Sequence, residues 1–215
     1  MMLYLESNTR PDISFSVHQC AKVSHKTAVK RICRYLQGIK DNGIEFNPSK
    51  KMVVDYYADA NFAGLWGHEI PQDPICARSR TGFVVTFVNY PLLWVSKLQT
   101  EIPLYTLHSE YVALSHSVRA LLPLKSLTKE VIDNLGIDSE KLKFVSNSTI
   151  YEENNGAIVV ATSPRMTPSS KHIAVKYHWF RQHVGNEFFD SEDQIRKSES
   201  RYFHQRFTRS NICKD

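Results

Sequence analysis

The sequence lacks any hydrophobic run that approaches the ~20 residues a helix needs to cross a bilayer. Residues Met1 to Arg10 also lack the basic and then apolar layout of a secretory signal. The four cysteines are scattered, without a Cys-x-x-Cys pair, which predicts reduced thiols rather than a disulfide framework. His68 and Cys76 have no second pair of ligands, so they predict surface loop residues rather than a zinc site. These absences favour an intracellular protein, whether cytoplasmic or nuclear.

The composition is that of a folded protein. The chain has 215 residues, of which 42% are hydrophobic and 23% charged. This length suits one full domain with appendages and supplies enough material for a hydrophobic core. Aromatic and β-branched residues are plentiful, which argues against disorder of the whole chain.

The positive charge is concentrated near the start of the chain. Residues 1–51 hold nine lysines and arginines against four acidic residues, a difference of +5 that equals the net charge of the whole chain. A basic lobe beside a neutral, acid-bearing lobe indicates a polyanionic partner. An ordinary solvated basic helix explains the charge equally well.

A basic amphipathic helix is predicted from about Lys26 to Gly38. Its apolar stripe has spacings of three and four residues and consists of Val29, Ile32, Cys33, Leu36 and Ile39. The candidate nucleic-acid contacts on this helix are Lys26, Lys30, Arg31 and Arg34. Such a helix could lie along a phosphate backbone, or it could pack against a core with its basic residues solvated.

Three acidic positions stand where strands end or a helix begins. The run from Met52 to Gly64 reads as a strand that ends at Asp59 and opens into small residues, which leaves a carboxylate at a sheet edge. Glu110 lies one position off the apolar stripe of a predicted helix, where it could point toward the sheet or be exposed. A further strand, 142–151, ends in Glu152 and Glu153.

The remaining elements complete an α/β pattern. Two strands, 81–86 and 92–97, predict a hairpin. An apolar repeat from Leu107 to Leu121 predicts a helix that Pro123 should kink or split, with a second piece running to Gly136. Helices are also predicted at 157–161, capped by 154–156, and at 172–184. After a helical preface, the order is three strands, helix, strand, helix, helix.

This order resembles the ribonuclease H fold, a mixed sheet flanked by helices, here with a short helical N-terminal segment. Tyr57 to Gly64, YADANFAG, is similar to the YADADFAG motif of copia-type LTR retrotransposon polymerases. Further similar segments follow in the same order: TGF (81–83), WVSKLQ (94–99), SEYVAL (109–114), YEENNGAI (151–158), SKHI (170–173) and YHWFR (177–181). Residues 9–13 and 29–36 resemble the end of the reverse transcriptase that precedes this domain. Many motifs in one order, over about residues 3–188, indicate common descent.

The resemblance implies three segments. Residues 1–50 are expected to be a helical remnant of the reverse transcriptase, and 51–188 the ribonuclease H-like domain. The tail, 189–215, is expected to be irregular, because it shows no helical or strand period. It lacks the family's ADIxTK segment and is interpreted as an out-of-frame remnant. Synonymous codons can be chosen for 190–207 so that ADIFTK appears one nucleotide later, and the gene sequence tests this interpretation.

The same resemblance implies a nuclease that cuts RNA in RNA–DNA hybrids with two Mg²⁺ ions. Asp59, Glu110 and Glu153 match its catalytic and metal-binding acids. Glu153 replaces a family Asp, and one extra carbon moves the carboxylate by about 1.5 Å. A displacement of about 1 Å can cost roughly a hundredfold in rate. With the fourth acid also missing, activity is expected to be impaired; the alternatives are an inactive nucleic-acid-binding module or a non-functional transposon relic.

Two histidines, His172 and His178, are candidates for a supporting role in catalysis near this site. The alternative is that both are helix histidines whose hydrogen bonds are satisfied within the fold.

Overall fold

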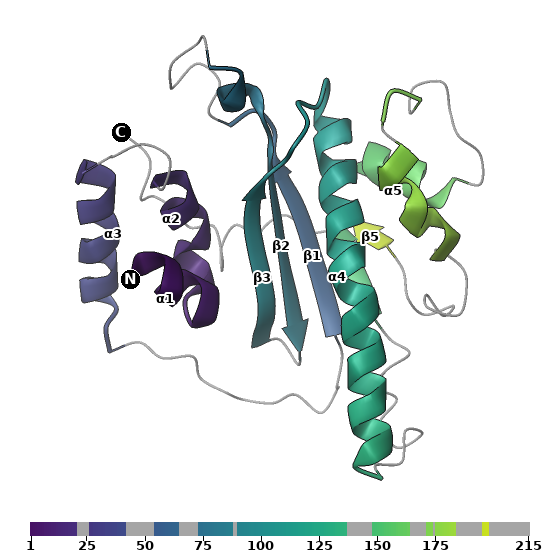
Figure 1. Ribbon diagram of the computed structural model, residues 1–215, viewed down its shortest axis with the longest axis horizontal. Helices are drawn as coiled ribbons and strands as arrows, with labels where there is room; N and C mark the ends of the chain where they lie inside the picture. The colour runs from purple at the N-terminus through teal and green to yellow at the C-terminus, as the bar shows by residue number, and fades with distance from the viewer. Residues whose placement is uncertain are drawn as a thin grey trace.

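The computed structural model describes residues 1–20, 26–41, 54–64, 73–87, 90–136, 148–163, 171–173, 175–183 and 195–197. A sheet lies at the centre, with short N-terminal helices on one side and the long helix α4 (Thr106–Asn134) on the other (Figure 1). Helix α5 (Asn155–Thr162) packs beside α4. The predicted mixed sheet flanked by helices, with its helical N-terminal segment, is therefore confirmed.

Five strands form one sheet in the order β3-β2-β1-β4-β5. The first three are antiparallel neighbours, which confirms the predicted hairpin, whereas β4 runs parallel to β1 and β5 parallel to β4. The bounds are β1 Val54–Asn61, β2 Arg80–Phe87, β3 Tyr90–Leu98, β4 Ser148–Glu152 and β5 Ile195–Lys197. The order of elements from β1 through α4 and β4 to α5 is the one predicted from the sequence.

Strand β5 corrects the expectation of an irregular tail. Ile195–Lys197 pair with residues 150–152 of β4 and extend the sheet at that edge. A three-residue strand is too short to show an alternating pattern, and its partner lies more than forty residues earlier in the chain, so no local signal could predict it. The other tail residues lie outside the described residues.

Helix α4 is one continuous helix that contains Pro123, so of the two predicted outcomes, a kink or a split, the split does not occur. Its first half carries the predicted apolar stripe, and Tyr111, Leu114, Val118 and Leu121 are all fully buried in the main core. Proline removes one backbone hydrogen bond from a helix, and we attribute the continuity to the packing of this stripe against the sheet.

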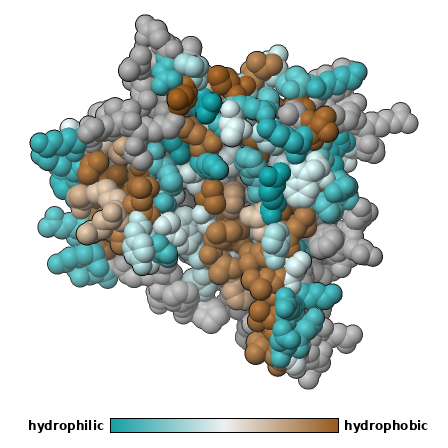
Figure 2. All heavy atoms as spheres, in the orientation of Figure 1, coloured by the Kyte–Doolittle hydropathy of each residue, from teal (hydrophilic) through white to brown (hydrophobic). Residues whose placement is uncertain are grey.

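The second half of α4 projects beyond the sheet. Leu127, Val131 and Leu135 are each about half exposed or more, and Ile132 is the residue that enters the core. Figure 2 shows hydrophobic side chains along this part of the molecule. The predicted helix therefore exists here, but its apolar residues do not form a buried stripe.

The predicted α-helix at 172–184 is instead two 3₁₀-helices, η4 (Val175–Tyr177) and η5 (Trp179–His183). Backbone bonds three residues apart, from His178 N–H to Val175 and from Arg181 N–H to His178, define these turns. Tyr177 and Phe180 are still buried in the main core, as the apolar pattern predicted. The pattern identified the buried side but not the type of helix.

The N-terminal helices cover the sheet face opposite α4. Their bounds are α1 Met2–Asn8, η1 Pro11–Ile13, α2 Ser14–Cys20 and α3 Lys26–Gly38. The indole N–H of Trp94 on β3 donates to the Glu6 carbonyl of α1 over 2.6 Å, whereas the neighbouring Val95 packs against the main core. Helix α1 was not predicted from the sequence.

Cys76 is a second correction, because it is buried in the 3₁₀-helix η2 (Pro74–Ala77) rather than exposed on a loop. The Asp73 side chain accepts a hydrogen bond from the Ile75 N–H and caps this turn. The three described cysteines, Cys20, Cys33 and Cys76, form no disulfide, in agreement with the prediction. His68 lies outside the described residues.

Asp12 lies in η1 and links this turn to helix α3. Its carboxylate accepts hydrogen bonds from the Arg10 guanidinium at 2.8 Å and from the Tyr35 hydroxyl at 2.9 Å. Burial alone raises the pKa of Asp12, but the hydrogen bonds from Arg10 and Tyr35 outweigh it and hold the pKa below its ordinary value. The hydrogen bond from Tyr35 therefore holds α3 against η1, because Asp12 lies 23 residues earlier in the sequence.

Replacing Tyr35 with Phe is expected to lower the free energy of unfolding by about 1–2 kcal/mol, since it removes a hydrogen bond to a charged group. Urea unfolding followed by circular dichroism measures this change. Tyr4→Phe is the control, because Tyr4 is 70% exposed. An equal loss in both variants would contradict the role of the Asp12 bond.

Candidate carboxylate site

The structure brings two predicted acids, Asp59 and Glu110, to one end of the sheet. Asp59 lies near the end of β1, paired with Gly82 of β2, and is half-buried. Glu110 lies near the start of α4 and is only 6% exposed. The backbone N–H of Ala60, the residue after Asp59, donates a hydrogen bond to Glu110. Glu110 therefore points toward β1 rather than into solvent.

Glu152 is the acidic residue that sequence reasoning missed. It ends β4, is fully buried, and accepts a hydrogen bond from the Asn154 N–H at 3.0 Å. Asn154 in turn caps α5, as predicted, by accepting from the Ala157 N–H. Strand alternation was the available signal, because Glu152 stands two residues after the buried Ile150 and so shares its face. Glu153, the predicted third acid, is half-buried just beyond the strand.

These acids interact through their charges. Burial, followed by repulsion from Glu152 and Asp59, raises the pKa of Glu110 to about 9, although the Ala60 N–H lowers it; Glu153 contributes a smaller repulsion. Burial, with repulsion from Asp59 and Glu153, raises the pKa of Glu152 to about 8, against the Asn154 N–H, which lowers it. Both carboxyl groups therefore bind a proton more tightly than an ordinary glutamate does.

One oxygen of each buried acid lacks a partner. Within the described residues, Oε2 of Glu110 and Oε2 of Glu152 have no hydrogen bond. An orphaned buried carboxyl oxygen is costly, and the protonated form reduces that cost. These two oxygens are the ones that a cation would be expected to approach.

Strand alternation places Asp59 and Glu152 on different faces of the sheet. Tyr57 of β1 lies opposite Tyr151 of β4, and their rings stack 4.8 Å apart. Asp59 lies two residues after Tyr57 in β1 and therefore shares the face of these tyrosines. Alternation assigns Glu152 to the other face, with Glu110 on α4.

The structure also bears on whether these acids form a metal site. Among the residues that the structure describes, no three His, Cys, Asp or Glu side chains form a group that could hold a metal ion. The acids are nevertheless near enough to repel one another. Among the described residues the structure therefore shows no set of ligands for the Mg²⁺ ions that the family resemblance implies.

The two predicted histidines have different surroundings. The Tyr111 hydroxyl lies 2.9 Å from Nδ1 of His178, inside the aromatic cluster around Phe180. His172 is exposed and contacts the edge of His108, with ring centroids 5.3 Å apart. The contact with Tyr111 favours the interpretation of His178 as a structural histidine.

The basic residues of α3 lie away from the acids. Lys26, Lys30 and Arg34 are exposed, Arg31 is half-buried, and Ile32 is the buried residue of the predicted stripe. Helix α3 lies beyond α1 and α2, on the other side of the sheet from α4 (Figure 1). In the same view, hydrophilic side chains gather over the outer side of α3 (Figure 2). The structure does not bring the predicted nucleic-acid contacts to the carboxylate site.

The similarities to known proteins point to transposons. The chain is 30% identical over 192 residues to the retrovirus-related Pol polyprotein from transposon TNT 1-94 of Nicotiana tabacum, a match that covers 86% of this chain. It is also 30% identical over 182 residues, or 82% of its length, to the corresponding polyprotein from transposon RE1 of Arabidopsis thaliana. Its homologues are retrovirus-related Pol polyproteins of plant transposons. The resemblance inferred from the motifs is thereby confirmed.

The chain spans only a small part of these Pol polyproteins, 13% of the first and 11% of the second. No family model matches it. Among solved structures, LC11-RNase H1, isolated from compost by a metagenomic approach, is similar at 15% identity and a TM-score of 0.41, over 70% of this chain and 85% of that one. None of the helices in the described residues is both long and apolar enough to cross a membrane.

Proposed function

We propose that this ribonuclease H-like part of a retrotransposon Pol polyprotein descends from a nuclease that cuts RNA in RNA–DNA hybrids, and that its own hydrolysis is strongly impaired. The observation that supports this proposal is the buried Glu152, which adds a carboxyl group beside Glu110 while no three acids of the described residues form a metal-holding group. We keep Asp59, Glu110 and Glu153 as the proposed remnants of the catalytic set.

Proton binding at the site opposes metal binding. Carboxylates bind Mg²⁺ in their deprotonated form, so a cation must displace any proton they hold. Burial and mutual repulsion raise the pKa of Glu110 to about 9 and that of Glu152 to about 8. Mg²⁺ binding at this site would therefore require the release of any proton that Glu110 or Glu152 holds.

We further propose that the domain retains affinity for nucleic acid through the exposed cations of α3. Lys26, Lys30 and Arg34 stand four residues apart and so share one side of the helix. Cations in this arrangement bind phosphates with a strong dependence on salt and little dependence on sequence. The alternative, a relic without function, would show no such binding.

A labelled RNA–DNA hybrid incubated with the protein and Mg²⁺ tests the proposal. We expect cleavage no faster than that of the Asp59→Asn variant, because the ancestral chemistry is already impaired. Electrophoretic mobility shifts at increasing salt should show binding that weakens steadily. Wild-type cleavage about a hundredfold or more above Asp59→Asn would contradict the proposed impairment.

A matched pair of charge variants tests whether hybrid binding depends on α3 or only on the total positive charge of the protein. Lys30→Gln should weaken hybrid binding and lower the salt slope by about one. Lys129→Gln removes the same charge from an exposed position on α4, on the other side of the sheet, and should leave binding nearly unchanged. Equal effects of the two variants would contradict a binding role for α3.

A further inference from the structure

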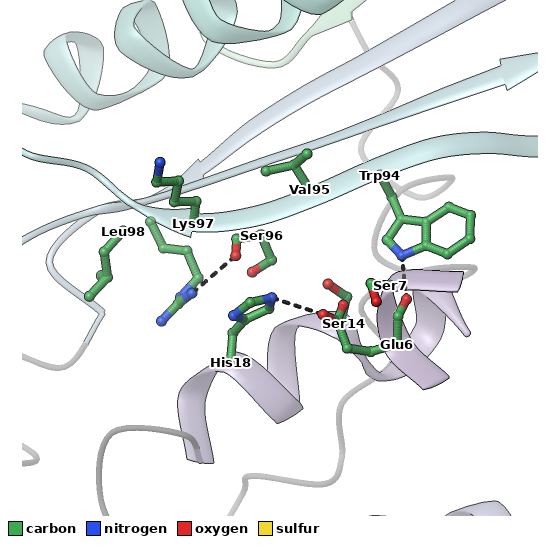
Figure 3. A pocket seen from close by; sticks show the side chains of 10 residues that line it. Glu6, Ser7, Ser14, His18, Trp94, Val95, Ser96, Lys97 and Leu98 are labelled. Carbon is green, nitrogen blue, oxygen red and sulfur yellow. Dashed lines mark hydrogen bonds and ion pairs between the residues drawn. The ribbon is translucent and has the colours of Figure 1, made fainter. Parts of the chain in front are cut away.

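A cavity of about 530 Å³ lies between the N-terminal helices and the outer face of the sheet. Its walls come from α1, α2, the start of β2 and the second half of β3 (Figure 3). This face is opposite α4, which carries Glu110. The function proposed above does not use it.

Arg80 supplies a buried positive charge to this cavity. The residue is only 6% exposed, and its guanidinium donates one long hydrogen bond, 3.5 Å, to the Ser96 carbonyl. The Phe15 ring lies 5.9 Å from the guanidinium carbon. Within the described residues no carboxylate pairs with Arg80, and burial lowers its pKa. A guanidinium has five N–H donors, so most of its hydrogen-bonding capacity remains unused.

Two serine hydroxyls at the cavity also lack partners. Ser14 on α2 and Ser96 on β3 are 5% and 8% exposed, and within the described residues neither Oγ makes a hydrogen bond. Both residues line the same cavity as Arg80. A buried hydroxyl without a partner is destabilising, so a ligand that accepts from both would relieve that cost.

The other charged residues of the cavity do not compensate Arg80. Glu6 is the acidic residue that lines the cavity, and its Oε1 lies 3.1 Å from Nε2 of His18 rather than pairing with Arg80, as Figure 3 shows. Lys97 points to the other side of the strand. Trp94 and Leu98 add apolar walls. The unpaired donors of the cavity therefore suit an anion that accepts several hydrogen bonds.

We propose that this cavity binds a phosphate group, either as the free ion or as part of a small nucleotide. The planar guanidinium of Arg80 would donate to two phosphate oxygens, and the hydroxyls of Ser14 and Ser96 would donate to the others. A carboxylate offers only two oxygens and would leave part of this donor set unpaired. Binding here involves no chemistry and is independent of hybrid cleavage.

Inorganic phosphate is the first probe, with thermal unfolding as the readout and sodium chloride of matched ionic strength as the reference. At about ten times its Kd, phosphate should raise Tm by about 3–6 °C, and the shift should saturate. Arg80→Gln should abolish the shift while keeping or raising Tm in chloride, because it removes an uncompensated buried charge. Lys129→Gln, at an exposed position on α4 and outside the cavity lining, should keep the wild-type response.

A second variant covers the case in which Arg80→Gln does not fold. Ser14→Ala with Ser96→Ala keeps the guanidinium and should weaken phosphate binding at least about tenfold, as expected for two lost hydrogen bonds to an anion. A wild-type Tm shift no larger than that in chloride, or an unchanged response in this double variant, would overturn the proposal.

Two further probes identify the source of the phosphate. A tighter response to adenosine 5′-monophosphate than to inorganic phosphate assigns the site to a nucleotide, and equal responses assign it to the free ion. Stabilisation by a short RNA–DNA duplex, with none from either small probe, would overturn the proposal in favour of a backbone contact elsewhere.

Discussion

Raising the pH from about 5 to about 9 is expected to lower the free energy of unfolding by an amount on the order of 5–10 kcal/mol. Glu110 and Glu152 have ordinary pKa values of 4.5, and the folded protein raises them to about 9 and about 8. Between these limits the folded state binds more protons than the unfolded state, so stability decreases as pH rises. The stabilisation is fully present below pH 4.5 and is lost by about pH 9.

Urea unfolding at a series of pH values measures this dependence. Glu152→Gln should flatten the alkaline part of the curve, because it removes one titrating group and lessens the repulsion on Glu110. Glu130→Gln is the control, since Glu130 is exposed on the far half of α4. A flat wild-type curve would contradict the buried pair. If millimolar Mg²⁺ prevented the loss of stability at alkaline pH, a cation would be replacing the protons at the site. That result would contradict the proposed impairment.

Replacing Phe180 with Ala is expected to lower the free energy of unfolding by about 3–5 kcal/mol. Phe180 is fully buried, and its ring lies 5.4 Å from that of Tyr111 on α4. The loss combines the transfer of a large apolar side chain with the cavity left in the main core. It would remove a large share of a domain stability of about 5–15 kcal/mol.

Thermal unfolding should show a Tm about 6–20 °C below wild type for Phe180→Ala. Leu127→Ala is the matched control on α4, because Leu127 is 56% exposed and its loss should change the free energy of unfolding by no more than about 0.5 kcal/mol. Similar Tm values for Phe180→Ala and wild type would mean that η5 (Trp179–His183) does not pack in the core.

Elements with strong local periodicity could be predicted from the sequence. The repeat through Tyr111, Leu114, Val118 and Leu121 indicated a buried helix face, and all four residues are fully buried. The hairpin of β2 and β3 was similarly visible as two apolar runs around one turn. In these segments the pattern that forms the element also determines what it buries.

The choice between Glu152 and Glu153 as the third acid depends on which face of the sheet each side chain occupies. Glu152 and Glu153 are adjacent, and in a strand adjacent side chains point to opposite faces. The family motif indicated Glu153, but the fold buries Glu152 beside Glu110. Sequence reasoning weighed the motif and did not extend the alternation from Ile150 to the end of β4.

Other features depended on contacts between distant segments. Strand β5 exists because three residues pair with β4, and α1 lies where Trp94 and Glu6, 88 residues apart, form a hydrogen bond. The helix at 172–184 was misassigned because the positions of Ile173, Tyr177 and Phe180 suit 3₁₀ turns on the core as well as an α-helix. Local pattern does not distinguish these alternatives.

The packing of α1 and α2 on the sheet bears on where the chain can be cut. A fragment that starts at residue 51 would uncover Arg80, Val84 and Ser96, all of them buried in the whole chain. It would also leave the Trp94 indole without its acceptor. An excised fragment of this kind should therefore be less stable than the whole chain and prone to self-association through the bare side of its sheet.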